Sequence, residues 1–386
     1  MTSLTKKIDL SKIAFTLALV LIISRKYMMS FIDPNIDINA IKSLLFYGSI
    51  GILGLIFIFD SRKSISEILL VFICGILYIL NREGAILLMV LLAVAAKKID
   101  DKYIVKNYLI ISVVFLIAVI LIFNLYPWLK NNNQIHYRYI AKTNSSVPRM
   151  DYGLGNPNSV FYRMIPIYGA YIFLRFKNYN LIDRLILFGS VFFIYKTTYS
   201  RTGFITIFAG LIVVEIIRVI DIKKFKPLAM LAKISPIILA FMSIILGTVF
   251  YKNSWLNGIL ASRPKYWNVY LLQEGNFLKL FGNSYDAIVK SSYPLDNSYV
   301  YAITTLGLVT FALFMYILYK GIGSFIEKDK KAYLVVLAMF LIYSFGEELL
   351  LDSAYSFAIV LAIKEFISID NREINLYKRI NRRKKC

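Results

Sequence analysis

Three arginines stand in sequence surroundings that are suited to binding an anion. Arg149 precedes a Gly-Leu-Gly-Asn-Pro-Asn turn, Arg201 stands in a Ser-Arg-Thr-Gly sequence, and Arg263 opens an Arg-Pro-Lys-Tyr-Trp sequence. A guanidinium group can bind phosphate or carboxylate oxygens through two parallel hydrogen bonds. The alternative for each is an arginine whose head group extends to the membrane interface. The three segments together indicate phosphate recognition.

The turn after Arg149 leads into an apolar run. Asn156 and Asn158 flank a proline, which forces a tight turn, and Asn158 can cap the helix that follows. A helix N-terminus with free N–H groups beside an arginine is suited to an anion. Arg163, further along the same run, would extend such a site inward. The alternative is a plain loop at the start of a helix, with Arg149 at lipid headgroups.

Carboxylates accompany these arginines at two places. Asp296 stands in a Leu-Asp-Asn-Ser-Tyr sequence, where it or Asn297 can cap a helix. A carboxylate at the rim of a dry cavity near arginines can also act as a general base. Glu347, with Glu348 and Asp352 close by, is the rival candidate.

The composition indicates the kind of protein that holds these residues. Of the 386 residues 58% are apolar and 18% charged, and 45 Lys plus Arg against 23 Asp plus Glu give a net charge of +22. A soluble globular domain is less apolar and more charged, and a disordered chain has low hydrophobicity. In so apolar a chain the basic excess reflects membrane topology rather than nucleic-acid binding. We therefore expect a membrane protein with no nucleic-acid partner.

Few residues are available for a metal or a cofactor. The sequence has one histidine, His136, and two cysteines, Cys74 and Cys386, so it offers no disulfide framework and no Cys/His metal site. Glycine-rich phosphate loops of the Walker or Rossmann kind are also missing from the sequence. We expect neither a metal nor a cofactor.

Apolar runs long enough to cross a bilayer predict an all-α polytopic fold of about 12 transmembrane helices, in one membrane domain over residues 1–386. The runs lie near residues 11–30, 41–59, 64–80, 84–96, 104–126, 158–176, 181–198, 202–220, 227–251, 297–320, 331–347 and 354–369. No small-residue cleavage site follows the first run, so we expect a retained helix rather than a signal peptide.

Charge sets the predicted orientation. Most of the 45 basic residues fall in alternate connections and in the basic tail, residues 370–386, so both termini are expected in the cytoplasm. Two long connections, about 127–157 and 252–296, would then be extracytoplasmic. Loops this long in a compact chain are usually functional. The candidate site residues above lie in or next to these two connections, in the short outer turn between the seventh and eighth runs, and in the outer end of the eleventh run.

Taken in order, the polar segments resemble the O-antigen and capsular polysaccharide polymerase (Wzy-type) family, which is related to the O-antigen ligases. The resemblance rests on Gly153-Leu154-Gly155-Asn156-Pro157-Asn158, Ser200-Arg201-Thr202-Gly203, Arg263 to Trp267, Asp296-Asn297-Ser298-Tyr299 and Leu306-Gly307. It covers roughly residues 145–310. It implies a multi-span glycosyltransferase of the polyprenyl-phosphate-sugar (GT-C-like) class.

The resemblance also implies a reaction. Members of the family join oligosaccharide repeat units on undecaprenyl diphosphate at the outer face of the bacterial plasma membrane, in capsule, O-antigen or exopolysaccharide synthesis. Flippases and chain-length regulators of the same pathway are the implied protein partners. Related ligases often carry histidine where Asp296 stands, which leaves the base open. The alternatives are an O-antigen ligase and a flippase or transporter of lipid-linked oligosaccharides.

On this basis each candidate residue has a role. Fixed arginines would stabilise the charge that develops on the diphosphate leaving group. The expected catalytic residues are Arg201, Arg263 and Asp296. The expected substrate-binding residues are Arg149, Asn156, Asn158, Arg163, Tyr266, Trp267, Asn297, Tyr299 and Glu347. Among these, Tyr266, Trp267 and Tyr299 would stack on sugar rings, and Glu347 is the second candidate for the base.

Overall fold

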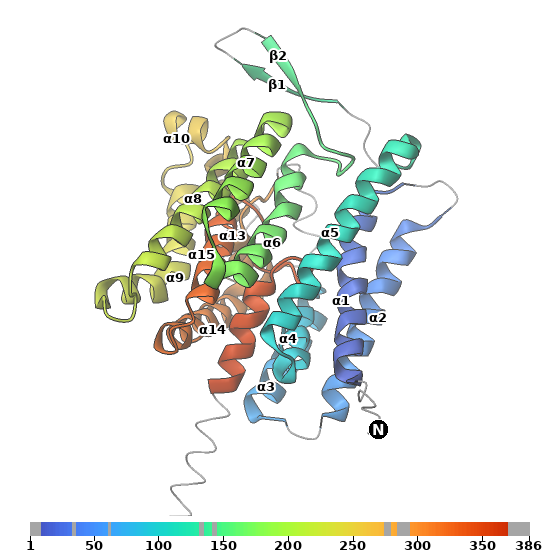
Figure 1. The fold of residues 1–386 in the computed structure, drawn as a ribbon, viewed down its shortest axis with the longest axis vertical. Helices are drawn as coiled ribbons and strands as arrows, with labels where there is room; N and C mark the ends of the chain where they lie inside the picture. Colours follow the sequence, from blue (N-terminus) through green and yellow to red (C-terminus); the bar gives the residue numbers. More distant parts are fainter. Residues whose placement is uncertain are drawn as a thin grey trace, which may run out of the picture.

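The computed structural model shows a mostly helical bundle (Figure 1). The residues that it describes are 9–32, 36–60, 63–130, 135–140, 145–273, 279–283 and 294–369. The predicted basic tail, residues 370–386, lies outside them, as do parts of both predicted long connections.

Helices occupy all the apolar runs that the sequence predicts. Those of the first half are α1 (Leu10–Met28), α2 (Ile38–Phe59), α3 (Ile65–Asn81), α4 (Ala85–Ala95), α5 (Asp101–Leu125) and α6 (Pro157–Arg175). Those of the second half are α7 (Leu181–Thr198), α8 (Arg201–Val219), α9 (Lys226–Thr248), α13 (Ser298–Tyr301), α14 (Gly307–Glu327) and α15 (Lys331–Tyr343). Two short helices, α10 (Ser254–Ile259) and α11 (Arg263–Asn268), lie in the second long connection. A last helix covers residues 357–369.

Several of these helices are suited to lipid. Among the described residues, five helical stretches are long and apolar enough to cross a membrane: α2, α5, α8, α9 and the stretch Ser298–Glu327 that contains α13 and α14. Large apolar side chains of α2 face outward, since Leu44 and Phe59 are 73% and 80% exposed. Such large exposed apolar surfaces are typical of a protein surrounded by lipid. The chain is therefore a helical membrane protein.

The first long connection adds a small β-hairpin to the otherwise helical fold that the sequence predicts. Its residues form two antiparallel strands, β1 (His136–Ile140) and β2 (Ser145–Arg149), with His136 opposite Arg149 and Arg138 opposite Val147. Tyrosine, isoleucine and valine favour extended backbone over helix, which explains the strands. This β-hairpin projects from one end of the bundle, which we call the hairpin end (Figure 1).

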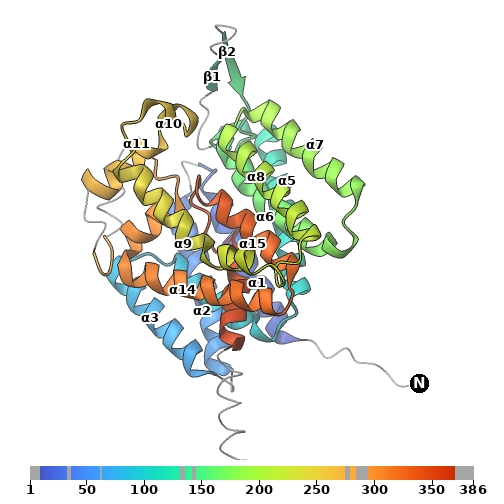
Figure 2. The ribbon, with the colours of Figure 1, turned by 90° about the vertical axis from the view of Figure 1, so that its left-hand side faces the viewer.

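Both long connections lie at the hairpin end. In two perpendicular views, α10, from the second connection, stands at the same end of the bundle as β1 and β2 (Figures 1 and 2). An isolated bridge between Phe31 and Lys130 joins the chain after α1 to the chain after α5 at this end. The described hairpin of the first connection and α10 of the second thus lie at one end of the bundle.

The last two helices form a short buried hairpin instead of two full spans. Lys330 Nζ, just before α15, lies 2.7 Å from Glu365 Oε2 in the last helix, so the start of one helix meets the end of the other. α15 has 13 residues, or about 20 Å, against the roughly 30 Å of a hydrocarbon core. The predicted spans 331–347 and 354–369 are therefore shorter than expected, and their connection, residues 344–356, turns inside the protein.

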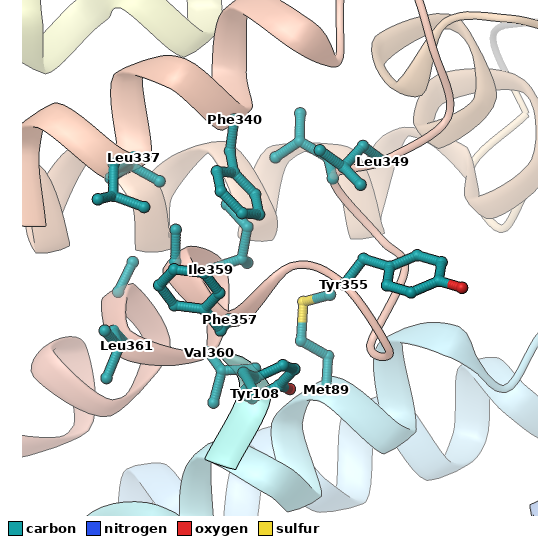
Figure 3. Close-up of a cluster of buried hydrophobic side chains, with 14 of the residues drawn as sticks. Met89, Tyr108, Leu337, Phe340, Leu349, Tyr355, Phe357, Ile359, Val360 and Leu361 are labelled. Atoms are coloured by element: carbon teal, nitrogen blue, oxygen red, sulfur yellow. The ribbon is translucent and has the colours of Figure 1, made fainter. Parts of the chain in front are cut away.

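Aromatic packing fixes this buried connection, which we call the tip (Figure 3). Phe340 of α15 packs against Phe357 of the last helix with ring centroids 5.2 Å apart. Tyr108 of α5 packs on Phe357 and donates a hydrogen bond to the carbonyl of Ser353, 2.9 Å away. The tip is thus held from α5 as well as from its own two helices.

Residues 279–283, ahead of α13, are held by a close contact between two stretches of backbone. Gly307, at the junction of α13 and α14, has a φ of +83°, and a Cβ there would lie 2.2 Å from the backbone nitrogen of Gly282. The N–H of Leu308 donates to the carbonyl of Lys279 at 3.0 Å, and the N–H of Asn283 to that of Thr304 at 3.1 Å. Two glycines therefore allow residues 279–283 to cross the helix junction in direct backbone contact.

Candidate functional site

Arg263 is placed by an unusual turn. Ala261 and Ser262 both have a positive φ, +53° and +63°, a conformation that costs free energy in residues other than glycine. The turn is closed by the N–H of Ser262, which donates to the carbonyl of Asn257 at 2.7 Å. It reverses the chain between α10 and α11 and directs the first side chain of α11, Arg263, into the protein, where it is only 5% exposed.

Arg263 joins three separate elements. Its Nη1 donates to Thr202 Oγ1 in the first turn of α8 at 2.7 Å. Its Nη2 lies 3.2 Å from Asp296 Oδ2, ahead of α13, and 3.1 Å from Glu347 Oε1 on the tip. The predicted catalytic residues Arg263 and Asp296 and the predicted Glu347 therefore meet, although they are far apart in sequence. We call these three residues the carboxylate centre.

The residues next to Asp296 and Glu347 hold the two carboxylates in place. The side chain of Asn297 caps α13 by accepting from the N–H of Val300, and its Nδ2 donates to Ser243 Oγ of α9 at 2.9 Å. The hydroxyl of Ser298 donates to the carbonyl of Glu347 at 2.9 Å. Asn297 is completely buried, so it supports the site and is not free to bind substrate, contrary to the expectation from the sequence.

Burial and charge act in opposite directions on Asp296. Loss of solvent raises the pKa of this carboxyl above its ordinary value, and the guanidinium of Arg263 acts to lower it. The side chain is still 33% exposed, because it borders a cavity. Asp296 thus combines a raised proton affinity with access for a ligand, which are the properties of a general base.

That cavity, which we call the central cavity, has a volume of about 350 Å³. It is bordered by both carboxylates of the centre and by polar residues of α1, α6 and the tip. The charged and hydroxyl-bearing lining residues are Lys26, Ser159, Tyr162, Arg163, Asp296, Glu347, Glu348, Asp352 and Tyr355. Arg163 is only 7% exposed and lies over the ring of Tyr27 at 5.1 Å, so it borders this cavity instead of extending the Arg149 segment inward.

Two cavity residues anchor the tip to neighbouring helices. Lys26 of α1 forms an ion pair with Asp352 Oδ2 at 2.8 Å. Tyr162 of α6 has its hydroxyl 2.8 Å from the same oxygen and 2.6 Å from the carbonyl of Glu348. The Asp352 side chain is 2% exposed, so it needs these partners.

A separate group of arginines lies at the hairpin end. Arg149 Nε of β2 donates to the carbonyl of Thr198 at 2.7 Å, and Arg138 of β1 donates to the carbonyl of Tyr199. Both carbonyls are at the C-terminus of α7, where cations are favoured. Arg201 begins α8 directly after this turn. We call Arg138, Arg149 and Arg201 the arginine cluster.

The three arginines are close enough to repel one another. Burial lowers the pKa of Arg138 and Arg149 below the ordinary value, and a neighbouring cation adds to this, Arg201 for Arg138 and Arg138 for Arg149. Within the described residues none of the three has a carboxylate in an ion pair. Such uncompensated positive charge favours binding of an anion.

The first turn of α8 joins the two groups. Arg201 belongs to the cluster and the next residue, Thr202, bonds to Arg263. Gly203 lets α6 approach closely, since a Cβ there would lie 2.4 Å from the ring of Phe161. The Ser-Arg-Thr-Gly sequence therefore supplies a cation, a hydrogen-bond partner and a close helix contact in succession.

Other predicted site residues have structural roles. Trp267 is completely buried and packs on Phe345 with ring centroids 5.5 Å apart. Tyr299 is 1% exposed and donates to the carbonyl of Leu341 at 3.0 Å. Neither ring is accessible for stacking on a sugar, so both expectations are wrong in this structure. Tyr266 keeps a partly exposed side chain.

The turn ahead of α6 also differs in detail from the expectation. Asn156, not Asn158, is the N-cap, and it accepts from the N–H of Asn158 at 2.8 Å. Asn158 instead accepts a hydrogen bond from Arg149 Nη2 at 3.0 Å. The cap lies two residues earlier because Pro157 has no N–H and fits the first helical position.

Four functional candidates escaped sequence reasoning. Arg138 stands among aromatic residues with no motif around it, and Lys26 reads as a break in an apolar run. Tyr162 and Ser159 are ordinary residues of α6. Only the side-by-side packing of α1, α6 and the tip brings Lys26 and Tyr162 to one carboxylate. Within the described part of the chain, no group of three or more His, Cys, Asp or Glu side chains could hold a metal ion.

Comparison with protein families, with curated proteins and with solved structures gives no match to this chain.

Proposed function

We propose that this protein is a polysaccharide polymerase of the plasma membrane. It transfers a growing glycan from undecaprenyl diphosphate to a sugar hydroxyl of the next lipid-linked repeat unit. In this proposal the chain crosses the membrane with both termini in the cytoplasm and the hairpin end outside. The basic residues at the opposite ends of the helices, such as Lys97 and Lys330, would then lie in the cytoplasm.

The proposal rests on one observation: the arginine cluster and the carboxylate centre meet at the first turn of α8. The arginine cluster offers positive charge that no described carboxylate compensates, and the carboxylate centre offers a base beside a cavity. Arg201 belongs to the cluster, and the next residue, Thr202, accepts a hydrogen bond from Arg263 of the centre. A glycosyl transfer from a diphosphate needs both functions within the length of one sugar.

The residues divide the reaction between them. The bond between the anomeric carbon and the diphosphate oxygen breaks, and its electron pair stays on the diphosphate, whose charge Arg138, Arg149 and Arg201 stabilise. The acceptor hydroxyl oxygen forms the new bond to the anomeric carbon, and its proton passes to Asp296, with Glu347 as the alternative base.

This assignment changes the expected role of Arg263. Two carboxylates compensate its charge and its side chain is 7% exposed, so it is poorly suited to hold a diphosphate. Instead it keeps Asp296 and Glu347 at one nitrogen atom. Arg263 is thus a positioning residue, and Arg138 replaces it in the group that holds the diphosphate.

Two alternatives use the same features differently. An O-antigen ligase would transfer finished chains to another acceptor with the same residues. A flippase or transporter would place its polar site near the bilayer midplane, often on broken helices. The tip, which carries Glu347 and Glu348, interrupts the helices before and after it in this way. Of the two alternatives, this observation favours the transporter.

Deletion of the gene, followed by sizing of the lipid-linked glycans, separates the three functions. Single repeat units that accumulate outside the membrane are expected for a polymerase. Full-length lipid-linked polymer would indicate a ligase, and single repeat units trapped inside would indicate a flippase. Complementation with Arg201→Ala should reproduce the deletion when the variant is present at wild-type level, and normal polymer in that strain would refute the proposal.

A further inference from the structure

A second polar cavity borders the central one on the side of α1, α2 and the α3–α4 turn. It has a volume of about 500 Å³, and we call it the α1–α2 cavity. The two cavities share Lys26, Met29, Glu348 and Asp352 as lining residues. A ligand that extends along both would therefore pass the Lys26–Asp352 ion pair and reach the carboxylate centre.

The wall of the α1–α2 cavity away from the tip combines cations with aromatic hydroxyls. Arg25 lies over the ring of Phe46 at 4.8 Å, and its Nε is buried with no hydrogen-bond partner in the described structure. Arg82 ends α3 with a φ of +54°, which brings its side chain to the turn before α4. Both guanidinium groups are close enough to the hydroxyl of Tyr78 to act on it electrostatically.

Three carboxylates line the same cavity, and two of them have partners in the described structure. Asp352 is paired with Lys26, and Glu83 accepts the N–H of Ala85 at 3.2 Å. Glu348 belongs to the shared wall next to the centre, on the tip. Within the described residues Arg25 and Arg82 have no carboxylate in an ion pair. The part of the cavity that is furthest from the tip therefore holds two cations, Arg25 and Arg82, against one carboxylate, Glu83.

We infer that the α1–α2 cavity binds the diphosphate of a second lipid-linked substrate, the acceptor, through Arg25 and Arg82. The inference rests on the proposed function. The donor diphosphate lies at the arginine cluster, and the acceptor sugar must reach Asp296 from the other side, through the central cavity. Bidentate guanidinium contacts suit diphosphate oxygens, and the hydroxyl of Tyr47, which accepts from that of Tyr78, supplies a donor beside them.

The test counts bound lipids. The full chain is placed in nanodiscs of neutral phosphatidylcholine, and the binding of undecaprenyl diphosphate without sugar is measured by native mass spectrometry. Two molecules per wild-type chain are expected. The double variant Arg25→Gln, Arg82→Gln should keep the lipid at the arginine cluster and bind the second lipid at least about tenfold more weakly. The double variant Arg138→Gln, Arg201→Gln should instead keep the lipid in the α1–α2 cavity and lose the one at the arginine cluster.

Arg218→Gln is the matched control, because Arg218 stacks on Tyr179 at 4.8 Å, the same distance as Arg25 on Phe46, but belongs to the last turn of α8. This control should bind two lipids. When Arg25→Lys replaces Arg25→Gln in the double variant, the charge is kept, and part of the affinity for the second lipid should return. This result separates a loss of binding from a loss of folding.

Two results would overturn the inference: two lipids bound to the Arg25→Gln, Arg82→Gln chain, or displacement of the second lipid by equimolar phosphatidylglycerol, which would make the cavity a general phospholipid site. Neither result bears on the arginine cluster. The proposed function fails separately, if the Arg138→Gln, Arg201→Gln chain still makes long polymer.

Discussion

Arg201 and Thr202 are consecutive residues of α8 that serve two different sites. Arg201 adds its charge to Arg138 on the β-hairpin, and Thr202 accepts a hydrogen bond from Arg263, 2.7 Å away in α11. Successive side chains of a helix point about 100° apart, so one turn can face both groups. The relative position of cations and carboxylates therefore depends on a single rigid element.

Loss of one cluster arginine should remove anion binding without unfolding the chain. Arg138→Gln relieves repulsion with Arg201, so thermal stability should stay the same or rise slightly. Inorganic pyrophosphate should raise the Tm of the wild-type chain by mass action and raise that of the variant less, because the variant keeps only the site proposed at Arg25 and Arg82. Differential scanning fluorimetry in detergent measures both.

Arg184→Gln is the control, because Arg184 is paired with Glu215 at 2.8 Å and belongs to the first turn of α7, whose last residues contact the cluster. Its response to pyrophosphate should equal that of the wild type. An undiminished pyrophosphate effect in Arg138→Gln would show that the cluster does not bind diphosphate.

Removal of the Arg263 charge should be strongly destabilising. Arg263→Met leaves two neighbouring carboxylates, Asp296 and Glu347, in a poorly solvated place with no cation between them. Breaking a buried ion pair in this way costs about 3–5 kcal/mol. Adding Glu347→Gln should recover part of the loss, because one of the two carboxylates is then neutral. Chemical unfolding in mixed micelles gives the free energies, and additive effects of the two changes would contradict the described geometry.

Acid should stop the proposed transfer reaction at a higher pH than an exposed aspartate would allow. Burial raises the pKa of Asp296, so the carboxylate accepts a proton, and loses its function as a base, earlier as the pH falls. The same raised pKa has the opposite effect on the stability of the fold, which it favours at low pH. The folded state holds this proton more tightly than the unfolded one, so this group favours folding at low pH, and its contribution is lost as the pH rises through the raised pKa.

The rate of transfer from a purified lipid-linked donor, measured against pH, tests this. Asp296→Glu should keep an acid limb in the profile, and Asp296→Asn should abolish most of the rate. Glu327→Gln, a change at a 75% exposed side chain, should leave the profile unaltered. An unchanged acid limb in Asp296→Asn would assign the base to another group, with Glu347 as the next candidate.

The helices were predictable because their apolar runs are long and their boundaries charged. The lengths of the last two helices, α15 and the helix over residues 357–369, were not predictable. Leu349, Leu350 and Leu351 of the tip are apolar and continue the hydropathy of α15, so a buried loop reads as part of a span. Packing of Phe340 against Phe357 decides where the helices end, and that contact joins residues whose pairing leaves no periodic signal.

The candidate site was predictable in its residue types and less so in its contacts. Arg263, Asp296 and Glu347 stood out as charges next to apolar runs, and they do meet. Their pairing removes the free charge for which Arg263 was selected, and this depends on tertiary contacts alone. Trp267 was misassigned because an aromatic residue beside cations looks alike in a binding site and in a core.

The two-glycine crossing should tolerate no side chain. Gly307→Ala puts a Cβ 2.2 Å from the backbone nitrogen of Gly282 in a residue with a φ of +83°, so both sterics and conformation oppose it. We expect a loss of at least about 2 kcal/mol in the free energy of unfolding. Gly258→Ala is the control, because nothing lies within 4 Å of a Cβ there and alanine favours the helix α10. Equal stability of the two variants would exclude the backbone crossing.

The ion pair between Lys26 and Asp352 should contribute far more than an exposed pair of similar length. Lys26→Met leaves the Asp352 carboxylate, 2% exposed, without its cation, and the expected cost is about 3–5 kcal/mol. Lys12 and Asp9 are 3.0 Å apart but 39% and 47% exposed, so Lys12→Met should leave the Tm unchanged within error. A double-mutant cycle with Asp352→Asn, followed by thermal unfolding, isolates the pair. A coupling energy near zero would mean that α1 does not hold the tip, and the border between the two cavities would then need another explanation.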